Sequence, residues 1–213
     1  MELQTMEAIW NACCANYTDS QDVIAISFDE IRRRYTGTAR HYHNLQHIGQ
    51  LLQLATQHRD QLQHWDCVVF AIFYHDVVYN VFRKDNEARS ADMADKRLAT
   101  LCVTADKIQV VRELIKATHK HQVTPTAPYA SDLAWFLDFD MAILGTPWEQ
   151  YEVYARQVRK EYRLYPDLMY NPGRRGFLQH TLQADRIFHT PWFHQQYTDT
   201  ARANMQRELQ WFQ

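Results

Sequence analysis

The stretch WDCVVFAIFYHD, residues 65–76, holds eight consecutive apolar residues followed by an ionisable pair, His75-Asp76. With its continuation to Val81 the segment is too long for an ordinary strand, although its β-branched and aromatic residues would suit one. It is apolar on every side, so we predict a buried central helix over residues 65–81. A histidine and an aspartate inside such a segment are costly unless something pairs with them. A neighbouring helix that hydrogen-bonds the histidine is one solution, and a bound cation is another.

The segments on both sides of this run also have helical spacing of apolar residues. Only five glycines and six prolines occur in 213 residues, whereas strand-rich folds need turn residues about every ten positions. We therefore expect an all-α fold of eight or nine helices in one compact domain, residues 1–213, with a helical core around residues 40–145 and packing helices at both ends. The other expected helices are residues 3–17, 22–35, 45 onward, 85–101, 104–118, 131–144, 147–162, 174–184 and 191–212.

Two helix starts have recognisable caps. Asn44 precedes an amphipathic segment and is the expected N-cap of the helix that carries His47. In Thr146-Pro147-Trp148-Glu149, the threonine, the proline and the glutamate have the spacing of a capping box with proline at the first helical position.

Composition narrows the function classes. A formal net charge of −2 gives no reason to expect general binding to nucleic acid or to an anionic membrane. The four cysteines, Cys13, Cys14, Cys67 and Cys102, do not form a disulfide framework, and the first residues lack a signal-peptide pattern. We expect a cytoplasmic protein without a membrane partner; a homo-oligomer is compatible with the sequence. Eleven histidines are many for this length, which motivates a search for a metal site.

Ionisable residues stand in three apolar segments. His47 lies among inward-facing residues of its helix, His75-Asp76 ends the central run, and Asp138-Phe139-Asp140 lies in a later apolar helix. One shared metal ion would explain all three. Two imidazoles and two carboxylates suit manganese, magnesium, iron, cobalt, nickel or zinc, and they leave coordination positions for water and substrate.

The order His, His-Asp, Asp on separate helices resembles the HD superfamily of metal-dependent phosphohydrolases. Local segments resemble a predicted bacterial subgroup of that superfamily, and the resemblance covers most of the chain from Arg40 onward. The matching segments are Tyr42-His43-Asn44 with His47-Ile48, Phe73-Tyr74-His75-Asp76 with Tyr79, Asn86-Glu87 with Ser90-Ala91, Thr118-His119-Lys120-His121, Asp138-Phe139-Asp140 with Ile143-Leu144-Gly145, Arg159-Lys160-Glu161-Tyr162, and Ala201-Arg202-Ala203-Asn204.

This resemblance implies that His47, His75, Asp76 and Asp140 hold a divalent metal ion. We choose Asp140 over Asp138 because Ala142-Ile143-Leu144 resembles the family's segment after the ligand aspartate. The expected activity is cleavage of a phosphomonoester or phosphoanhydride of a small molecule, most plausibly a nucleotide, by water that the metal activates. The alternatives are a metal-containing nucleotide sensor without turnover, and a purely structural helical protein.

Further residues are candidates for catalysis and substrate binding. Glu87 would act with Asp76 in catalysis by orienting water or protonating the leaving oxygen, or else it only complements its helix dipole. Charge stabilisation of a phosphoryl group needs cations. The substrate-binding candidates are Arg40, His43, Lys84 and Lys120, and His119 and His121 are candidates for a second metal or a phosphate; solvated bases and simple helix capping are the plainer interpretations.

Overall fold

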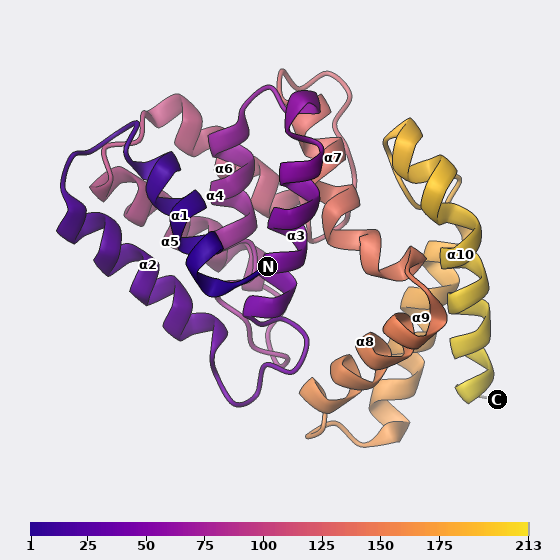
Figure 1. Ribbon diagram of the computed structural model, residues 1–213. Coiled ribbons are helices and arrows are strands. Elements are labelled where there is room, and N and C mark those ends of the chain that lie inside the picture. Colours follow the sequence, from indigo (N-terminus) through magenta and orange to yellow (C-terminus); the bar gives the residue numbers. More distant parts are fainter. Residues whose placement is uncertain (213) are drawn as a thin grey trace. The chain divides into compact units, whose positions relative to one another are not determined.

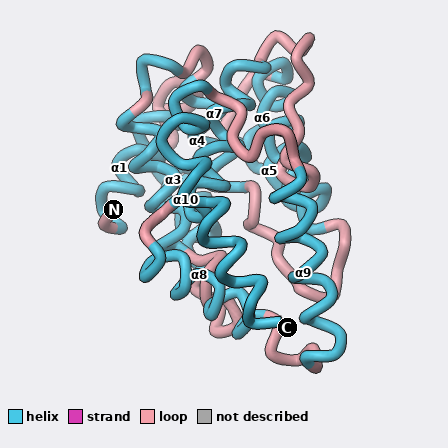
Figure 2. The backbone as a smooth tube through the Cα atoms, turned by 90° about the vertical axis from the view of Figure 1, so that its right-hand side faces the viewer, coloured by secondary structure: helices cyan, strands magenta, loops and turns pink. Residues whose placement is uncertain are grey.

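The computed structural model describes residues 1–212, and within that range every regular element is a helix (Figures 1 and 2). The predicted all-α fold is confirmed, with ten α-helices in the described range where we expected eight or nine. Their bounds are α1 Leu3–Cys14, α2 Gln21–Tyr35, α3 Leu45–Gln57, α4 Trp65–Tyr74, α5 Asn86–Thr100, α6 Ala105–Ala117, α7 Ala130–Met141, α8 Trp148–Glu161, α9 Asp167–Gln183 and α10 Pro191–Leu209, with the short 3-10 helices η1 Arg59–Gln61, η2 Ala142–Gly145 and η3 Gln210–Phe212.

The chain divides into two compact units. The first unit spans Met1–Phe136 and contains α1 to α6 with the first part of α7. The second unit begins at Leu137 and contains the end of α7, η2 and α8 to α10. The division falls inside α7, so one continuous helix belongs to both units.

Helix α4 is the centre of the first unit, and α1, α3, α5 and α6 pack around it (Figure 1). All eight residues from Cys67 to Tyr74 are completely buried, as their apolar character predicts. Trp10 of α1 packs edge-on against two of them, with its ring centroid 5.5 Å from that of Phe70 and 5.2 Å from that of Phe73. Burial of these large side chains supplies the main stabilisation of this unit.

The central helix is shorter than predicted, because α4 ends at Tyr74 and not at Val81. The buried hydroxyl of Tyr35, at the end of α2, donates a hydrogen bond to the Phe73 carbonyl at 3.0 Å. The same hydroxyl accepts one from the Asp76 backbone N–H at 3.2 Å. A side chain from another helix thus satisfies backbone groups where α4 stops, and His75-Asp76 stands in the turn that follows.

In the second unit, a buried charged network joins α8, α9 and α10. Arg174 and Glu208 form a two-fold hydrogen-bonded ion pair at 2.8 and 2.9 Å, and Tyr151 and Tyr154 each bond one partner. Helix α9 starts at Asp167, before the expected Arg174, and continues through Pro172. It therefore places Arg174 inside a helix, where it can face Glu208.

The capping box predicted at residues 146–149 does not form. The Thr146 hydroxyl donates to the Ile143 carbonyl at 2.8 Å, and Pro147 is the N-cap of α8, with no side-chain cap bond. The threonine closes the preceding 3-10 helix instead. The Asn44 cap is confirmed, since its side chain accepts a hydrogen bond from the Gln46 N–H at 2.8 Å.

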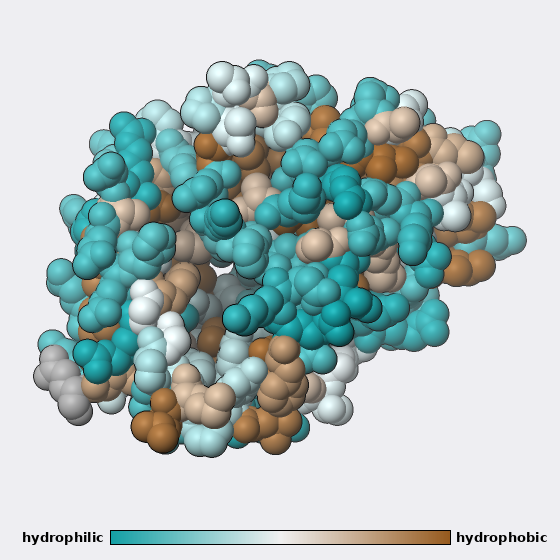
Figure 3. Space-filling model, turned by 180° about the vertical axis from the view of Figure 1, so that it is seen from behind, coloured by the Kyte–Doolittle hydropathy of each residue, from teal (hydrophilic) through white to brown (hydrophobic). Residues whose placement is uncertain are grey.

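The face shown in Figure 3 is mainly hydrophilic, with hydrophobic side chains in small separate groups. The large exposed hydrophobic side chains include Ile26, Leu164, Leu168 and Met169. No helix in residues 1–212 combines the length and the apolar character needed to span a bilayer.

Candidate metal centre

His47 is positioned by the start of α3. Because Asn44 caps the helix, His47 lies in its first turn and turns inward with Ile48 and Leu51, leaving only 2% of the residue exposed. Its ring lies 4.9 Å from that of Tyr42, measured between centroids, in the loop before the helix. The cap therefore fixes where this imidazole enters the core of the first unit.

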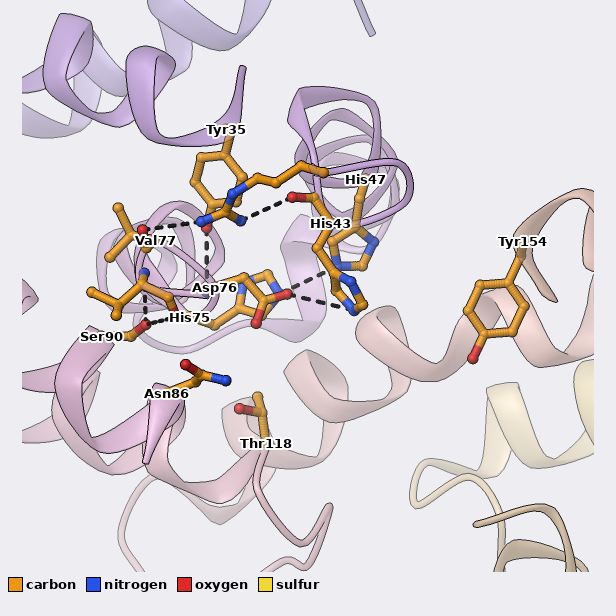
Figure 4. A network of polar contacts seen from close by, with 12 residues as sticks. Tyr35, His43, His47, His75, Asp76, Val77, Asn86, Ser90, Thr118 and Tyr154 are labelled. Atoms are coloured by element: carbon orange, nitrogen blue, oxygen red, sulfur yellow. Dashed lines mark hydrogen bonds and ion pairs between the residues drawn. The ribbon is translucent and has the colours of Figure 1, made fainter. Parts of the chain in front are cut away.

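His75 meets His47 at the end of α4, as Figure 4 shows. The Nε2 atoms of the two rings are 3.2 Å apart, and His75 is 1% exposed. Two nitrogens at this separation, each about 2.1 Å from a common ion, would subtend about 100° at that ion. That angle lies between those of octahedral and tetrahedral coordination, so both rings can bind one metal ion.

The second nitrogen of His75 fixes its protonation. His75 Nδ1 is 2.9 Å from the Ile72 carbonyl, which can only accept a hydrogen bond, so this nitrogen carries a proton. When the ring is neutral, Nε2 presents a lone pair. A carbonyl that orients an imidazole in this way is the usual outer support of a metal-binding histidine.

Asp76 brings a carboxylate to the same place. Its Oδ2 is 3.2 Å from His75 Nε2 and 4.0 Å from His43 Nε2, and 17% of its side chain is exposed. The lone pair of His75 thus faces both a carboxylate oxygen and the nitrogen of His47. A hydrogen bond donated by His47 Nε2, or a cation bound between these atoms, would make these contacts favourable.

The predicted substrate contact His43 borders this cluster. Its side chain is 22% exposed, and its ring lies 4.5 Å from the ring of Tyr79, between centroids. It is therefore held beside Asp76 while remaining accessible. The structure brings together His43, His47, His75 and Asp76, all within the first unit (Figure 4).

Arg40 has both terminal guanidinium nitrogens occupied. Nη1 donates to the His43 carbonyl at 2.9 Å and Nη2 donates to the Val77 carbonyl at 3.1 Å. Its guanidinium also lies over the Tyr35 ring, 4.8 Å from the centroid. Arg40 thus ties the loop before α3 to the turn after α4, and this geometry favours a positioning role over the predicted contact with substrate.

The remaining candidates lie at the ends of α5 and α6. Glu87, in the first turn of α5, has its Oε2 3.4 Å from Nδ1 of His119, with 28% and 54% of the two side chains exposed. His121 takes a left-handed backbone conformation with φ 50°, and its N–H donates to the Ala117 carbonyl at 2.8 Å. Lys84 and Lys120 are exposed to solvent.

The two aspartates of α7 differ in their surroundings. Asp138 is completely buried and accepts hydrogen bonds from the His189 N–H, the Thr190 N–H and the Thr190 hydroxyl at 2.7 to 2.8 Å. Burial raises its pKa, and its bonds to the segment before α10 occupy both oxygens. Asp138 is therefore a structural residue, and Asp140 stays the predicted ligand.

Asp140 belongs to α7 as well and lies in the second unit. His47, His75 and Asp140 are a group of side chains that could hold a metal ion. Among residues 1–212, His119 and His121 belong to no such group. A possible His/Asp metal site is thus present.

Two residues that support the site were not predicted. Tyr35 anchors the end of α4, and the Ser90 hydroxyl accepts from the Val78 N–H at 3.1 Å in the turn after Asp76. Nothing in the sequence indicates the Tyr35 contact, because a tyrosine on the apolar stripe of an amphipathic helix is indistinguishable from an ordinary core residue. Ser90 lies in a matching segment of the resemblance, but its contact with Val78 depends on the fold.

Comparison of the chain with protein-family models, curated proteins and solved structures finds no match. The resemblance to HD phosphohydrolases therefore consists of the sequence segments quoted above.

Proposed function

We propose that this protein is a metal-dependent phosphohydrolase that cleaves a phosphomonoester or phosphoanhydride bond of a small molecule, with nucleotides as the first class to test. His47, His75, Asp76 and Asp140 would hold the divalent ion. These residues offer two imidazoles and two carboxylates, a donor set that suits manganese, iron, cobalt, nickel and zinc and, less well, magnesium.

One observation carries this proposal: His75 Nε2 lies 3.2 Å from both His47 Nε2 and Asp76 Oδ2, while its other nitrogen is committed to the Ile72 carbonyl. Three buried or half-buried atoms that would each bind a cation converge on one point. The convergence favours a metal site over a satisfied core histidine.

A bound divalent ion supplies a Lewis acid that lowers the pKa of water and polarises a phosphoryl oxygen. The protein's own groups would do the rest. His43, accessible beside Asp76, would contact the phosphate, and Arg40 would keep His43 in place through its backbone carbonyl. Glu87, beside His119, would accept a proton from water or return one to the leaving oxygen.

The test is hydrolysis of a panel of nucleotides and sugar phosphates by untagged full-length protein with manganese, magnesium, cobalt or zinc. We expect release of phosphate or pyrophosphate from at least one compound in the presence of a transition metal. Asp76→Ala should abolish it, because the variant loses a carboxylate from the centre. Asp185→Ala, which removes an exposed carboxylate, is the matched control and should keep full activity.

Binding experiments separate the alternatives. Tight nucleotide binding by metal-loaded protein without any turnover would favour a sensor over an enzyme. Retention of no divalent ion at neutral pH by folded protein would refute the metal centre and the hydrolase together.

A further inference from the structure

A groove lies between α2 and α5 in the first unit, and the function proposed above does not use it. Its volume is about 550 Å³, and its lining includes Val23, Ile26, Glu30, Arg33, Arg34 and Arg97. Pockets that bind small molecules are commonly about 300–1,000 Å³. The groove therefore has the size of a small-molecule site.

Its charges favour an anion. Three guanidinium groups and one carboxylate line the groove, and Asp29, outside the lining, pairs with Arg33 at 2.9 Å, which leaves an excess of one positive charge. Arg97 donates hydrogen bonds to both carboxylate oxygens of Glu30, at 2.6 and 3.0 Å. The nearest guanidinium nitrogen of Arg34 is 3.9 Å from the same carboxylate. Glu30 is thus faced by two arginines, and it neutralises only one of them.

The arginines also remain accessible. The exposed fractions of the Arg33, Arg34 and Arg97 side chains are 66%, 49% and 42%. A guanidinium presents a flat set of donors that matches the oxygens of phosphate, phosphonate or carboxylate. Arg34 can therefore bind an incoming anion without breaking a close ion pair of its own.

The buried Arg174–Glu208 pair shows why this arrangement is unlike a structural ion pair. Arg174 and Glu208 are 7% and 1% exposed, and two tyrosine hydroxyls complete their network. The Arg97–Glu30 pair, by contrast, is partly exposed, with 42% of the Arg97 side chain and 22% of the Glu30 side chain accessible to solvent.

The apolar part of the lining selects for more than a bare ion. Val23 and Ile26 stand on α2 together with Arg33 and Arg34, and Ile26 is 66% exposed. An apolar group of a ligand would cover part of this exposed side chain and gain affinity by leaving water.

We propose that the α2–α5 groove binds a small organic anion. Its phosphate, phosphonate or carboxylate group would contact Arg34 and Arg97, and its apolar body would lie against Val23 and Ile26. This site is separate from the metal centre, so binding does not require His75 or Asp76.

The test uses phenylphosphonate as the probe, because it combines an apolar ring with a dianion and has no ester bond that a phosphohydrolase could cleave. Titration calorimetry with the full-length protein should show saturable binding at one site. Inorganic phosphate and benzyl alcohol, which carry only the charge or only the ring, should bind more weakly.

Adjacent arginines offer matched variants with the same change of charge. Arg34→Gln should weaken phenylphosphonate binding about fivefold, the loss expected for a half-exposed charge contact. Arg32→Gln, on the same turn but outside the groove lining, should leave binding unchanged, and Asp76→Ala should also leave it unchanged.

Two outcomes would overturn the proposal. One is the absence of saturable binding at millimolar phenylphosphonate. The other is an equal effect of Arg32→Gln and Arg34→Gln, which would show general charge attraction. Loss of binding in Asp76→Ala alone would place the ligand at the metal centre and likewise refute the groove, whatever the outcome of the hydrolysis assay.

Discussion

Replacing Tyr35 by phenylalanine removes a single oxygen from the end of the central helix. That oxygen donates to the Phe73 carbonyl at 3.0 Å and accepts from the Asp76 N–H at 3.2 Å, and the residue is 1% exposed. The ring keeps its packing in the variant. The substitution therefore probes the two hydrogen bonds that hold the start of the His75-Asp76 turn.

The expected size follows from those two bonds. A typical intramolecular hydrogen bond contributes about 0.5–1.5 kcal/mol net, so two contribute about 1–3 kcal/mol. The free energy of unfolding should fall by that amount, since the carbonyl and the N–H are left without the hydroxyl. Loss of an outer support of a metal ligand typically weakens metal binding by about 10- to 100-fold, and we expect the lower end because Tyr35 contacts the backbone next to the ligands.

Tyr74→Phe is the matched control. It removes the same atom from another fully buried tyrosine of the first unit, but the hydroxyl of Tyr74 has no hydrogen-bond partner within residues 1–212. Urea unfolding should show no loss of stability for this variant, or a gain, because a buried unpaired hydroxyl is removed. Calorimetric titration with manganese should give wild-type affinity. Equal stability of the Tyr35→Phe protein and the wild type would show that these two hydrogen bonds do not stabilise the end of α4.

Three further predictions concern charged side chains. Asp138→Asn should destabilise the protein by about 1–3 kcal/mol in urea, because it replaces an acceptor at the segment before α10, without changing the number of bound metal ions. Arg174→Met should cost about 3–5 kcal/mol by leaving Glu208 buried and unpaired, and adding Glu208→Met should restore most of the loss. The hydrogen bonds from Arg97 lower the pKa of Glu30, so this pair stabilises the fold above the ordinary glutamate pKa of about 4.3 and loses its contribution as pH falls through the lowered value. In Arg97→Gln, the free energy of unfolding, measured in urea at a series of pH values, should depend less on pH in the acid range. An unchanged dependence on pH would contradict the role given to this pair.

Much of the fold follows from local pattern. The run from Cys67 to Tyr74 is apolar on all sides and becomes the fully buried centre of the first unit. Asn44 predicts its helix start because capping depends on a few consecutive residues. The predicted end of α4 was wrong by seven residues, because the Tyr35 hydroxyl that bonds the backbone groups at this end comes from another helix.

The candidate site was likewise predictable only where it depends on local sequence. His75 and Asp76 were recognisable as ionisable groups where the core should be, and His47 as a histidine on an inward face. From the sequence alone, Arg40 cannot be distinguished from a substrate-binding base. In the structure its guanidinium donates hydrogen bonds to two backbone carbonyls. Partners of a long flexible side chain depend on tertiary contacts, which neither propensity nor periodicity contains.

The proposed metal centre requires that His47 and His75 bind the same divalent ion. X-ray absorption at the zinc edge of zinc-loaded, untagged protein measures the number of imidazole ligands directly. We predict two imidazoles at about 2.0–2.1 Å, falling to one in His47→Ala and remaining two when the exposed His180 is changed to alanine. A zinc ion with no imidazole ligand, or protein that retains no zinc, would contradict the account.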